Sequence, residues 1–445
     1  MTVAERVTGS IKSNRPPASA RPHHSRATWA WAFYDFANSP FSTTVVSVVF
    51  NVYYAKVVAQ DAGFPGDTLW GYLVAAATLA SAVCSPVLGA FADKRQVRKP
   101  LLACFAILGG AATIGLTWSQ EGTLLLSSAL YFVASLSFSC SLAFYNAFLN
   151  DLSTEETIGR ISGLGWALGY IGSGLCLAVN LLMIEKPGAL GLPTDAHWPV
   201  RLTFAMCGIW WIVFTLPILF WVPERRHGNA LLGRAAWAAA LTGVKKSLAT
   251  ARTANKNLFR YLIAYLLYND GIETAIVMAG VFASEILSMG QGEIVGCFLM
   301  IQFVAFFGAL GFGRLGDRWG NKKALQLSLT LWAIVLGWAV IMQTKTEFWM
   351  ASAAIAVVLG GSQSLSRSLF GKLIPQGSEA EFYGFLNLSS KVSATLGPLT
   401  YGLSRQLTGS PRIGILSMLI FFALGQALLV GVREPGRKIM EETPA

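Results

Sequence analysis

The most constraining feature of this sequence is a series of apolar runs, each long enough to cross a bilayer. A helix needs about 20 apolar residues to span the hydrocarbon core. The 445-residue chain contains two groups of six such runs. They lie near 29–57, 70–92, 101–118, 122–148, 160–184 and 198–222, and then near 258–284, 292–313, 323–343, 347–370, 381–403 and 412–432. The sequence therefore predicts an all-α integral membrane protein with twelve transmembrane helices.

The composition agrees with a surface that faces lipid. Charged residues make up 13% of the chain and hydrophobic residues 54%, whereas a soluble domain carries roughly 25% charged residues. The six cysteines all fall within apolar runs and form no C-x-x-C pair, so neither a disulfide framework nor a zinc site is indicated. We expect no cofactor and no metal.

The distribution of basic residues orients the helices. If the N-terminus is cytoplasmic, 27 Lys and Arg lie at cytoplasmic positions, six lie on the opposite side, and Lys391 lies inside a helix. Such an imbalance follows the positive-inside rule and predicts that both termini are cytoplasmic. The net charge of +11 is thus explained by topology, and no nucleic-acid partner is expected.

Polar interruptions divide the chain into four parts. We predict a flexible cytoplasmic tail at 1–28, a six-helix half at 29–222, a cytoplasmic linker at 223–257, and a second six-helix half with a short tail at 258–445. The middle of the linker alternates small apolar residues with Arg and Lys. It is either an amphipathic helix on the anionic inner leaflet or a plain connector.

The two halves carry matched motifs, which indicates an internal repeat. Residues 89–98 read Gly-Ala-Phe-Ala-Asp-Lys-Arg-Gln-Val-Arg, and residues 313–322 read Gly-Arg-Leu-Gly-Asp-Arg-Trp-Gly-Asn-Lys. Each has a Gly at a helix end, an Asp four residues later, and a basic cluster. The halves also end alike, in Val-Pro-Glu at 222–224 and Val-Arg-Glu at 432–434. Two repeats of six helices predict a central site between halves that rock against each other.

These strings resemble a known family of carriers. The loop at 313–323 is similar to the signature loop of the major facilitator superfamily, and 89–101 is a looser copy that lacks the Gly after Asp93. Further strings resemble the vacuole-effluxer-like branch of that superfamily; they lie at 31–39, 145–151, 163–172, 268–274, 363–370 and 382–398. The resemblance implies a twelve-helix secondary carrier. For the fungal relatives it implies export of amino acids from the vacuole, and it leaves the substrate of this chain open.

Four charged side chains lie well inside the predicted helices, away from the helix ends, where charge is costly unless it faces a cavity or a partner. They are Asp35, Asp270, Glu273 and Lys391. At 1.5 Å per residue, Lys391, Asp270 and Glu273 lie at similar depths, roughly 15 to 22 Å from the inner ends of their helices. We predict that they meet near the midplane as a charge-balanced cluster that binds solute. The alternative is a permanent ion pair that only fixes packing. Any proton coupling would use Asp270 or Glu273, since the four His lie outside the helices.

Other polar residues are candidates for the pathway or for packing. Arg367 could contact an anionic substrate or could extend toward lipid headgroups. Asn146 could bind solute or join helices through hydrogen bonds. The matched helix starts and the family-like strings add Asn38, Tyr268 and Gln363 to the predicted substrate or ion pathway.

The two repeated loops are predicted to be cytoplasmic gates. Asp93 and Asp317 are expected to pair with nearby Arg residues, or with helix N-termini across the interface between the halves, and so to hold one conformation. The full set of predicted gate residues is Gly89, Asp93, Arg98, Gly313, Asp317, Arg318, Gly320 and Lys322.

The sequence therefore favours a secondary carrier that moves a small polar solute by alternating access, with amino-acid or related metabolite efflux as a specific form. Co-transport of a proton or cation is left open. The expected setting is the cell membrane and a functional monomer. Two alternatives are a transporter-derived sensor or receptor without flux, and a membrane-embedded enzyme. The enzyme would need a catalytic cluster, which the sequence does not show.

Overall fold

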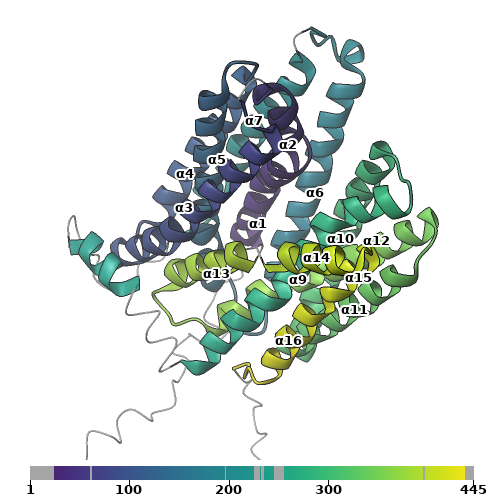
Figure 1. Ribbon diagram of the computed structural model, residues 1–445. Coiled ribbons are helices and arrows are strands. Elements are labelled where there is room, and N and C mark those ends of the chain that lie inside the picture. The colour runs from purple at the N-terminus through teal and green to yellow at the C-terminus, as the bar shows by residue number, and fades with distance from the viewer. Residues whose placement is uncertain are drawn as a thin grey trace, which may run out of the picture.

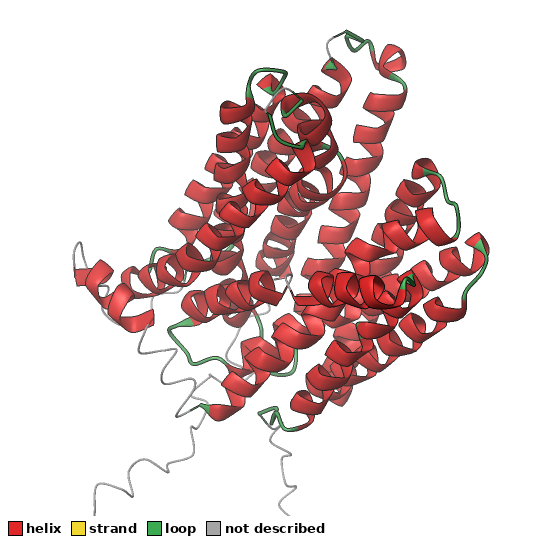
Figure 2. Ribbon diagram, in the orientation of Figure 1, coloured by secondary structure: helices red, strands yellow, loops and turns green. Residues whose placement is uncertain are grey.

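The computed structural model describes residues 25–60, 63–195, 197–224, 231, 235–244, 255–393 and 396–435. Within these ranges the chain forms helices joined by loops and contains no strand (Figure 2). This all-helical architecture confirms the predicted fold class, because a chain that crosses lipid as single segments must satisfy its backbone hydrogen bonds within each segment.

The first half of the chain forms one bundle of helices (Figure 1). Its first span begins with α1 (Ser25–Pro40) and continues through a π-helical segment (Phe41–Val48), α2 (Phe50–Tyr53) and a second π-helical segment (Tyr54–Val58). The irregular part starts directly after Pro40, which removes a backbone donor from the helix. The other helices are α3 (Gly66–Arg95), α4 (Arg98–Gly115), α5 (Leu124–Leu152), α6 (Ile158–Glu185) and α7 (Trp198–Trp221).

The second half forms a second bundle beside the first (Figure 1). Its helices are α9 (Lys256–Ile286), α10 (Gln291–Trp319), α11 (Asn321–Ile341), α12 (Lys345–Leu373), α13 (Glu379–Ser393), α14 (Leu396–Thr408), α15 (Pro411–Ser417) and α16 (Leu419–Val430). We call the end of the bundles that carries the loops after α3 and α10 the motif end, and the other end the opposite end.

Eleven helical segments among the described residues are long and apolar enough to span a membrane. The predicted span at 381–403 is covered by α13 and α14, and residues 394 and 395 between these two helices lie outside the described residues. With this pair included, the count agrees approximately with the twelve predicted spans.

Two equivalent contacts join the bundles at the motif end. Helix α6 packs on α10, and helix α13 packs on α3. Glycine allows the close approach in both places: a Cβ on Gly313 would meet the Gly159 carbonyl oxygen at 2.7 Å, and one on Gly89 would overlap the Ala380 carbonyl. Small residues let helix backbones approach closely in membranes. The repeat seen in sequence is therefore also a repeat of interfaces.

Part of the predicted linker packs on the first bundle. Residues 235–244 form a helix, and the Trp237 ring stacks on the Phe91 ring of α3 with centroids 4.3 Å apart. The Leu231 N–H donates to the Lys94 carbonyl. Most of the predicted tail at 1–28, the remainder of the linker between 225 and 254, and the end of the chain after 435 lie outside the described residues.

Two glycines on α10 provide a matched test of this packing. A Cβ on Gly308 would overlap the Val357 carbonyl of α12, whereas one on Gly311 would meet nothing within 4 Å. We expect Gly308→Ala to lower the apparent melting temperature in detergent, because overpacking costs about 1–3 kcal/mol. Gly311→Ala should leave the melting temperature unchanged or raise it slightly, since Ala favours helix. Equal melting temperatures for the two variants would contradict the close contact between α10 and α12.

Candidate functional site

A cavity of about 440 Å³ lies between the two bundles. That volume is in the range of small-molecule sites. Seven of the nine predicted pathway residues line it; they are Asp35, Asn38, Asn146, Glu273, Gln363, Arg367 and Lys391. The cavity also reaches Ile294, Met342 and Phe348, which lie near the opposite ends of α10, α11 and α12. It therefore extends from the middle of the protein toward the opposite end.

Arg367 links the two bundles, and it is the residue of α12 in the cavity wall that lies nearest the motif end. It belongs to α12, but its Nη1 lies 2.9 Å from Asp35 Oδ2 of α1 and 3.2 Å from Asn146 Oδ1 of α5. Its Nε and Nη2 donate to the hydroxyl and the carbonyl of Ser162 at 3.0 and 2.7 Å. A buried guanidinium is tolerated only when its donors are satisfied in this way. Arg367 is therefore an internal bridge and does not extend toward lipid headgroups.

Aromatic rings and one glycine complete the surroundings of Arg367. The rings of Trp31, Tyr145 and Trp166 lie 5.0, 5.5 and 5.4 Å from the guanidinium carbon, within the range of cation–π attraction. A Cβ on Gly165 would meet Arg367 Nη2 at 2.6 Å. Only glycine leaves room for the guanidinium here.

The structure divides the predicted cluster of Lys391, Asp270 and Glu273. Lys391 and Glu273 both line the cavity and attract each other electrostatically, yet no ion pair within 4.0 Å joins them among the described residues. Asp270 does not line the cavity and has no exposed surface. Residues three apart on a helix differ by about 60° in direction, which is enough to turn Asp270 away from the cavity that Glu273 faces.

Tyr268 also lies elsewhere than predicted. It is outside the cavity lining, and its hydroxyl contacts the Ser366 hydroxyl at 2.7 Å and the Tyr261 hydroxyl at 3.3 Å. Tyr265, almost one turn earlier on α9, lines the cavity instead. The sequence indicated Tyr268 because the first helix of each half carries a matched tyrosine, whereas no motif marks Tyr265.

At the motif end, the two repeated aspartates bind helix N-termini of the opposite bundle. Asp317 accepts hydrogen bonds from the backbone N–H groups of Gly159 and Arg160 at 2.8 and 3.1 Å, at the start of α6. Asp93 accepts from those of Ala380 and Glu381 at 3.3 and 3.0 Å, at the start of α13. A carboxylate at a helix N-terminus is stabilised by unpaired N–H groups and by the helix dipole. These contacts are the ones that the gate hypothesis requires.

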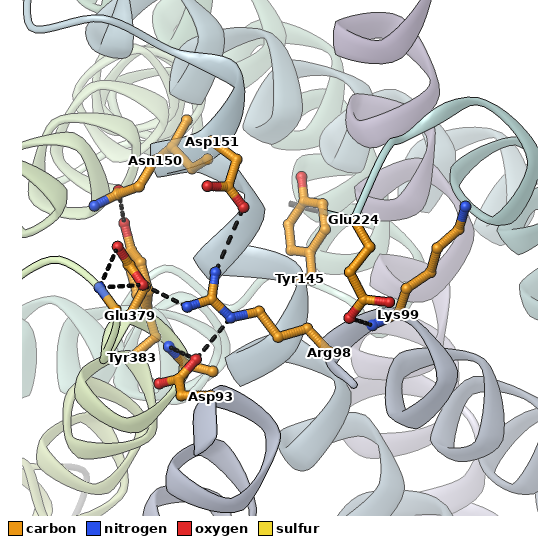
Figure 3. Close-up of polar contacts among 12 residues, drawn as sticks. Asp93, Arg98, Lys99, Tyr145, Asn150, Asp151, Glu224, Glu379 and Tyr383 are labelled. Carbon is orange, nitrogen blue, oxygen red and sulfur yellow. Dashed lines mark hydrogen bonds and ion pairs between the residues drawn. The ribbon is translucent and has the colours of Figure 1, made fainter. Parts of the chain in front are cut away.

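Arg98 gathers three carboxylates beside the Asp93 contact (Figure 3). Its Nε lies 2.6 Å from Asp93, its Nη1 lies 3.4 Å from Asp151 of α5, and its Nη2 donates to Glu379 of α13. Three carboxylates exceed the charge of one arginine, so the N-terminus of α13 also contributes positive potential. Asp151 ends one of the family-like strings, but nothing in the sequence linked it or Glu379 to Arg98.

No hydrogen bond or ion pair of Arg318 or Lys322 joins the bundles in the described part of the chain. The Arg318 side chain is exposed and forms no hydrogen bond or ion pair with Asp317 among the described residues. Lys322 acts within its own bundle, where its Nζ donates to the Val430 carbonyl at 2.7 Å. Gly320 ends α10 with φ +95°, a conformation that favours glycine. Lys322 therefore contacts its own bundle, and a gate role for Arg318 stays a prediction.

The matched segments that end the two halves explain the surroundings of Lys322. Glu434 accepts hydrogen bonds from the backbone N–H groups of Asn321 and Lys322 and forms an ion pair with Lys372 Nζ at 2.8 Å. Burial would raise the pKa of Glu434, but Lys372 and these N–H groups outweigh it and hold that pKa below its usual value. In the first half, Glu224 likewise accepts the Lys99 N–H, while Lys99 Nζ donates to the Val222 carbonyl. In each half, these hydrogen bonds thus connect the end of the last helix to the start of the third membrane span.

Comparison with known proteins decides the family. A family model described as "Vacuole effluxer Atg22 like" matches residues 67–438. The chain belongs to this family. The "Uncharacterized MFS-type transporter YxiO" of Bacillus subtilis is 30% identical over 409 residues, which cover 91% of this chain and 94% of that protein. "Autophagy-related protein 22" of Yarrowia lipolytica is 27% identical over 311 residues, 63% of this chain and 52% of the relative, so the match spans about half of the fungal protein.

Solved structures agree on the fold. The transporter FucP in its outward conformation matches with a TM-score of 0.71 at 13% identity, covering 93% of this chain and all of that one (100%). The proton:xylose symporter XylE matches with a TM-score of 0.69 at 14% identity, covering 92% and 96%. The Atg22-like chain therefore has the major facilitator fold, and the predicted family is confirmed. It is a multi-pass membrane protein and a secondary transporter, since its relatives are transporters and not enzymes.

We expect Asp317→Asn to weaken the link between α10 and α6. Losing a charge at a helix N-terminus costs about 0.3–2 kcal/mol, so the population in which the motif end is closed should fall several-fold. Spin labels at Glu121→Cys and Gln343→Cys, in a chain carrying Cys104→Ser, would report this as shorter distances between the opposite ends of the bundles.

Arg318→Ala is the matched control for this measurement, because it removes a neighbouring charge from an exposed side chain. It should leave the distance distribution unchanged. If Asp317→Asn also left the distribution unchanged, the aspartate would not hold the motif end closed.

Proposed function

We propose that this Atg22-like transporter moves a small zwitterionic solute, such as an amino acid, by alternating access. The observation that supports it best is the arrangement of Glu273 and Lys391. Both charges face one cavity and neither forms an ion pair within 4.0 Å among the described residues. Each charge is therefore available to a ligand group of opposite sign, as a solute with both an ammonium and a carboxylate would provide.

Polar and aromatic groups nearby suit the remainder of such a solute. Gln363, Asn38 and Ser390 add neutral hydrogen-bonding groups to the cavity wall, and Trp166 and Tyr170 add aromatic surface. A mostly apolar pocket with a few well-placed polar groups is typical of small-molecule sites. The description of the family as vacuole effluxers is consistent with export of such a solute.

The conformation supports an outward-facing state in the cell membrane, with both termini in the cytoplasm. The motif end carries the excess of basic residues, which supports a cytoplasmic location for that end, and at that end Asp93, Asp317 and Arg98 join the two bundles. The cavity extends toward the other end. To face inward, the bundles must rock and exchange these contacts for others. The Asp35–Arg367 pair is a further link between the bundles, at the wall of the cavity.

A sensor or receptor without flux is the second candidate. It would keep the same cavity and the same links between bundles, but it would bind solute without releasing it on the other side. Measured flux separates the two functions directly.

We expect loss of the gene to change the distribution of one class of zwitterionic metabolites between cells and medium. Restoring the wild-type chain should reverse the change, whereas Lys391→Met and Glu273→Gln should not, because each removes one of the two cavity charges. An untargeted metabolite comparison, with membrane abundance measured in parallel, provides the readout. Lys345→Ala is the control, since it removes a lysine that pairs with Glu293 at the surface. Full activity of both cavity variants would contradict the proposed site.

Cysteine labelling tests the orientation. In a chain carrying Cys104→Ser, Glu121→Cys and Gln343→Cys should react with a membrane-impermeant maleimide on intact cells, because both positions are exposed at the opposite end. Lys323→Cys is exposed at the motif end and should react only after permeabilisation. The reverse pattern would place the motif end outside the cell.

A further inference from the structure

Asp270 is a buried carboxylate that forms no ion pair with any cation of the described residues. It lies near the middle of α9, roughly 21 Å from the start of the helix, and it has no exposed surface. Neither carboxylate oxygen accepts a hydrogen bond from the described residues. The Gly397 N–H of α14 approaches the carboxylate but does not reach hydrogen-bond geometry. An ionised carboxylate in such a place is strongly disfavoured relative to a protonated one.

A second polar group lies against the same point. Thr274 is one turn from Asp270 on α9, and its hydroxyl also has no hydrogen-bond partner among the described residues. A Cβ built on Gly397 would overlap this hydroxyl and would lie 3.0 Å from Asp270 Oδ1. Two oxygen atoms of α9 therefore face one small space, which Gly397 keeps open and a larger residue would fill.

No cation of the described residues neutralises Asp270. On α13, Lys391 acts on Glu273 and not on Asp270. On α12, Arg367 pairs with Asp35, Lys345 with Glu293 of α10, and Lys372 with Glu434. On α14, Arg405 pairs with Glu285 of α9, and on α15, Arg412 donates to the Val340 carbonyl. On α16, the ring of Phe422 and the Cβ of Phe421 lie against the neighbouring Gly271. Glu273, nearly one turn away, adds only repulsion.

We propose that Asp270, with the Thr274 hydroxyl beside it, is a proton-binding site separate from the solute cavity. One proton adds to a carboxylate oxygen of Asp270 and leaves a neutral acid, which can donate a hydrogen bond to Thr274. Glu273 lies on the cavity wall and on the same helix, so the proton would travel between Asp270 and the cavity past Glu273. The proposal rests on the proposed transport function, because a proton site that differs between two conformations couples solute movement to a proton gradient.

Infrared difference spectroscopy of the full chain in nanodiscs tests this without a solute. The wild-type protein at neutral pH should show the carbonyl stretch of a protonated buried carboxylic acid, which shifts in deuterium oxide and disappears reversibly as the pH is raised. Asp270→Asn should lack the band, and Glu273→Gln should keep it. Thr274→Val, which leaves the acid but removes its hydrogen-bond acceptor, should move the band to higher frequency.

Several outcomes would overturn the proposal. They are a band that persists in Asp270→Asn, a wild-type protein without the band, and a band that does not titrate while the protein stays folded. Saturable binding of radioactive sodium that is lost in Asp270→Asn would assign the site to sodium instead of a proton. Size-exclusion profiles confirm that each variant is folded. Because the measurement needs no solute, its failure leaves the transport results for Lys391 and Glu273 standing, and failure of those results leaves the spectrum interpretable.

Discussion

The structure depends on carboxylates of one bundle that bind the helix N-termini of the other. The N–H groups in the first turn of α6 and α13 have no partner within their own helix and lie where the two bundles meet, so acceptors from the other bundle can satisfy them. Asp317 and Asp93 supply them across the interface. Because these bonds use backbone donors, they depend on where each helix begins and on how the bundles sit together. A small rotation of one bundle removes them, so they favour one arrangement and oppose intermediate ones.

Gene duplication explains why these contacts occur twice, and divergence explains why they differ. Both copies place a glycine where the helices touch, at Gly89 and Gly313. The first copy adds Arg98, which gathers carboxylates from three helices, whereas the second has only a distant contact of 3.9 Å between Arg160 and Asp317. The first contact is buried and charged, and the second is more exposed. The two halves of the interface therefore share geometry but not electrostatics.

Sequence reasoning predicted the membrane class, the approximate number of spans and the repeat, because apolar length and repeated motifs are local properties of a chain. It also placed most charged pathway residues at the cavity, since buried charge in lipid needs a polar surrounding. It failed where direction mattered: Asp270 and Glu273 are three residues apart yet face different surroundings, and Tyr265 rather than Tyr268 reaches the cavity. Pairs such as Arg98 with Glu379 are separated by 281 positions, and no pattern in one sequence connects them.

The stacking of Trp237 on Phe91 has a mechanical consequence. It attaches the middle of the inter-half linker to α3, two residues before Asp93. The described part of the linker is thus fixed beside one of the two aspartate contacts. A force on Trp237 acts first on the helix that carries Asp93, so the linker is mechanically connected to one of the contacts that join the halves.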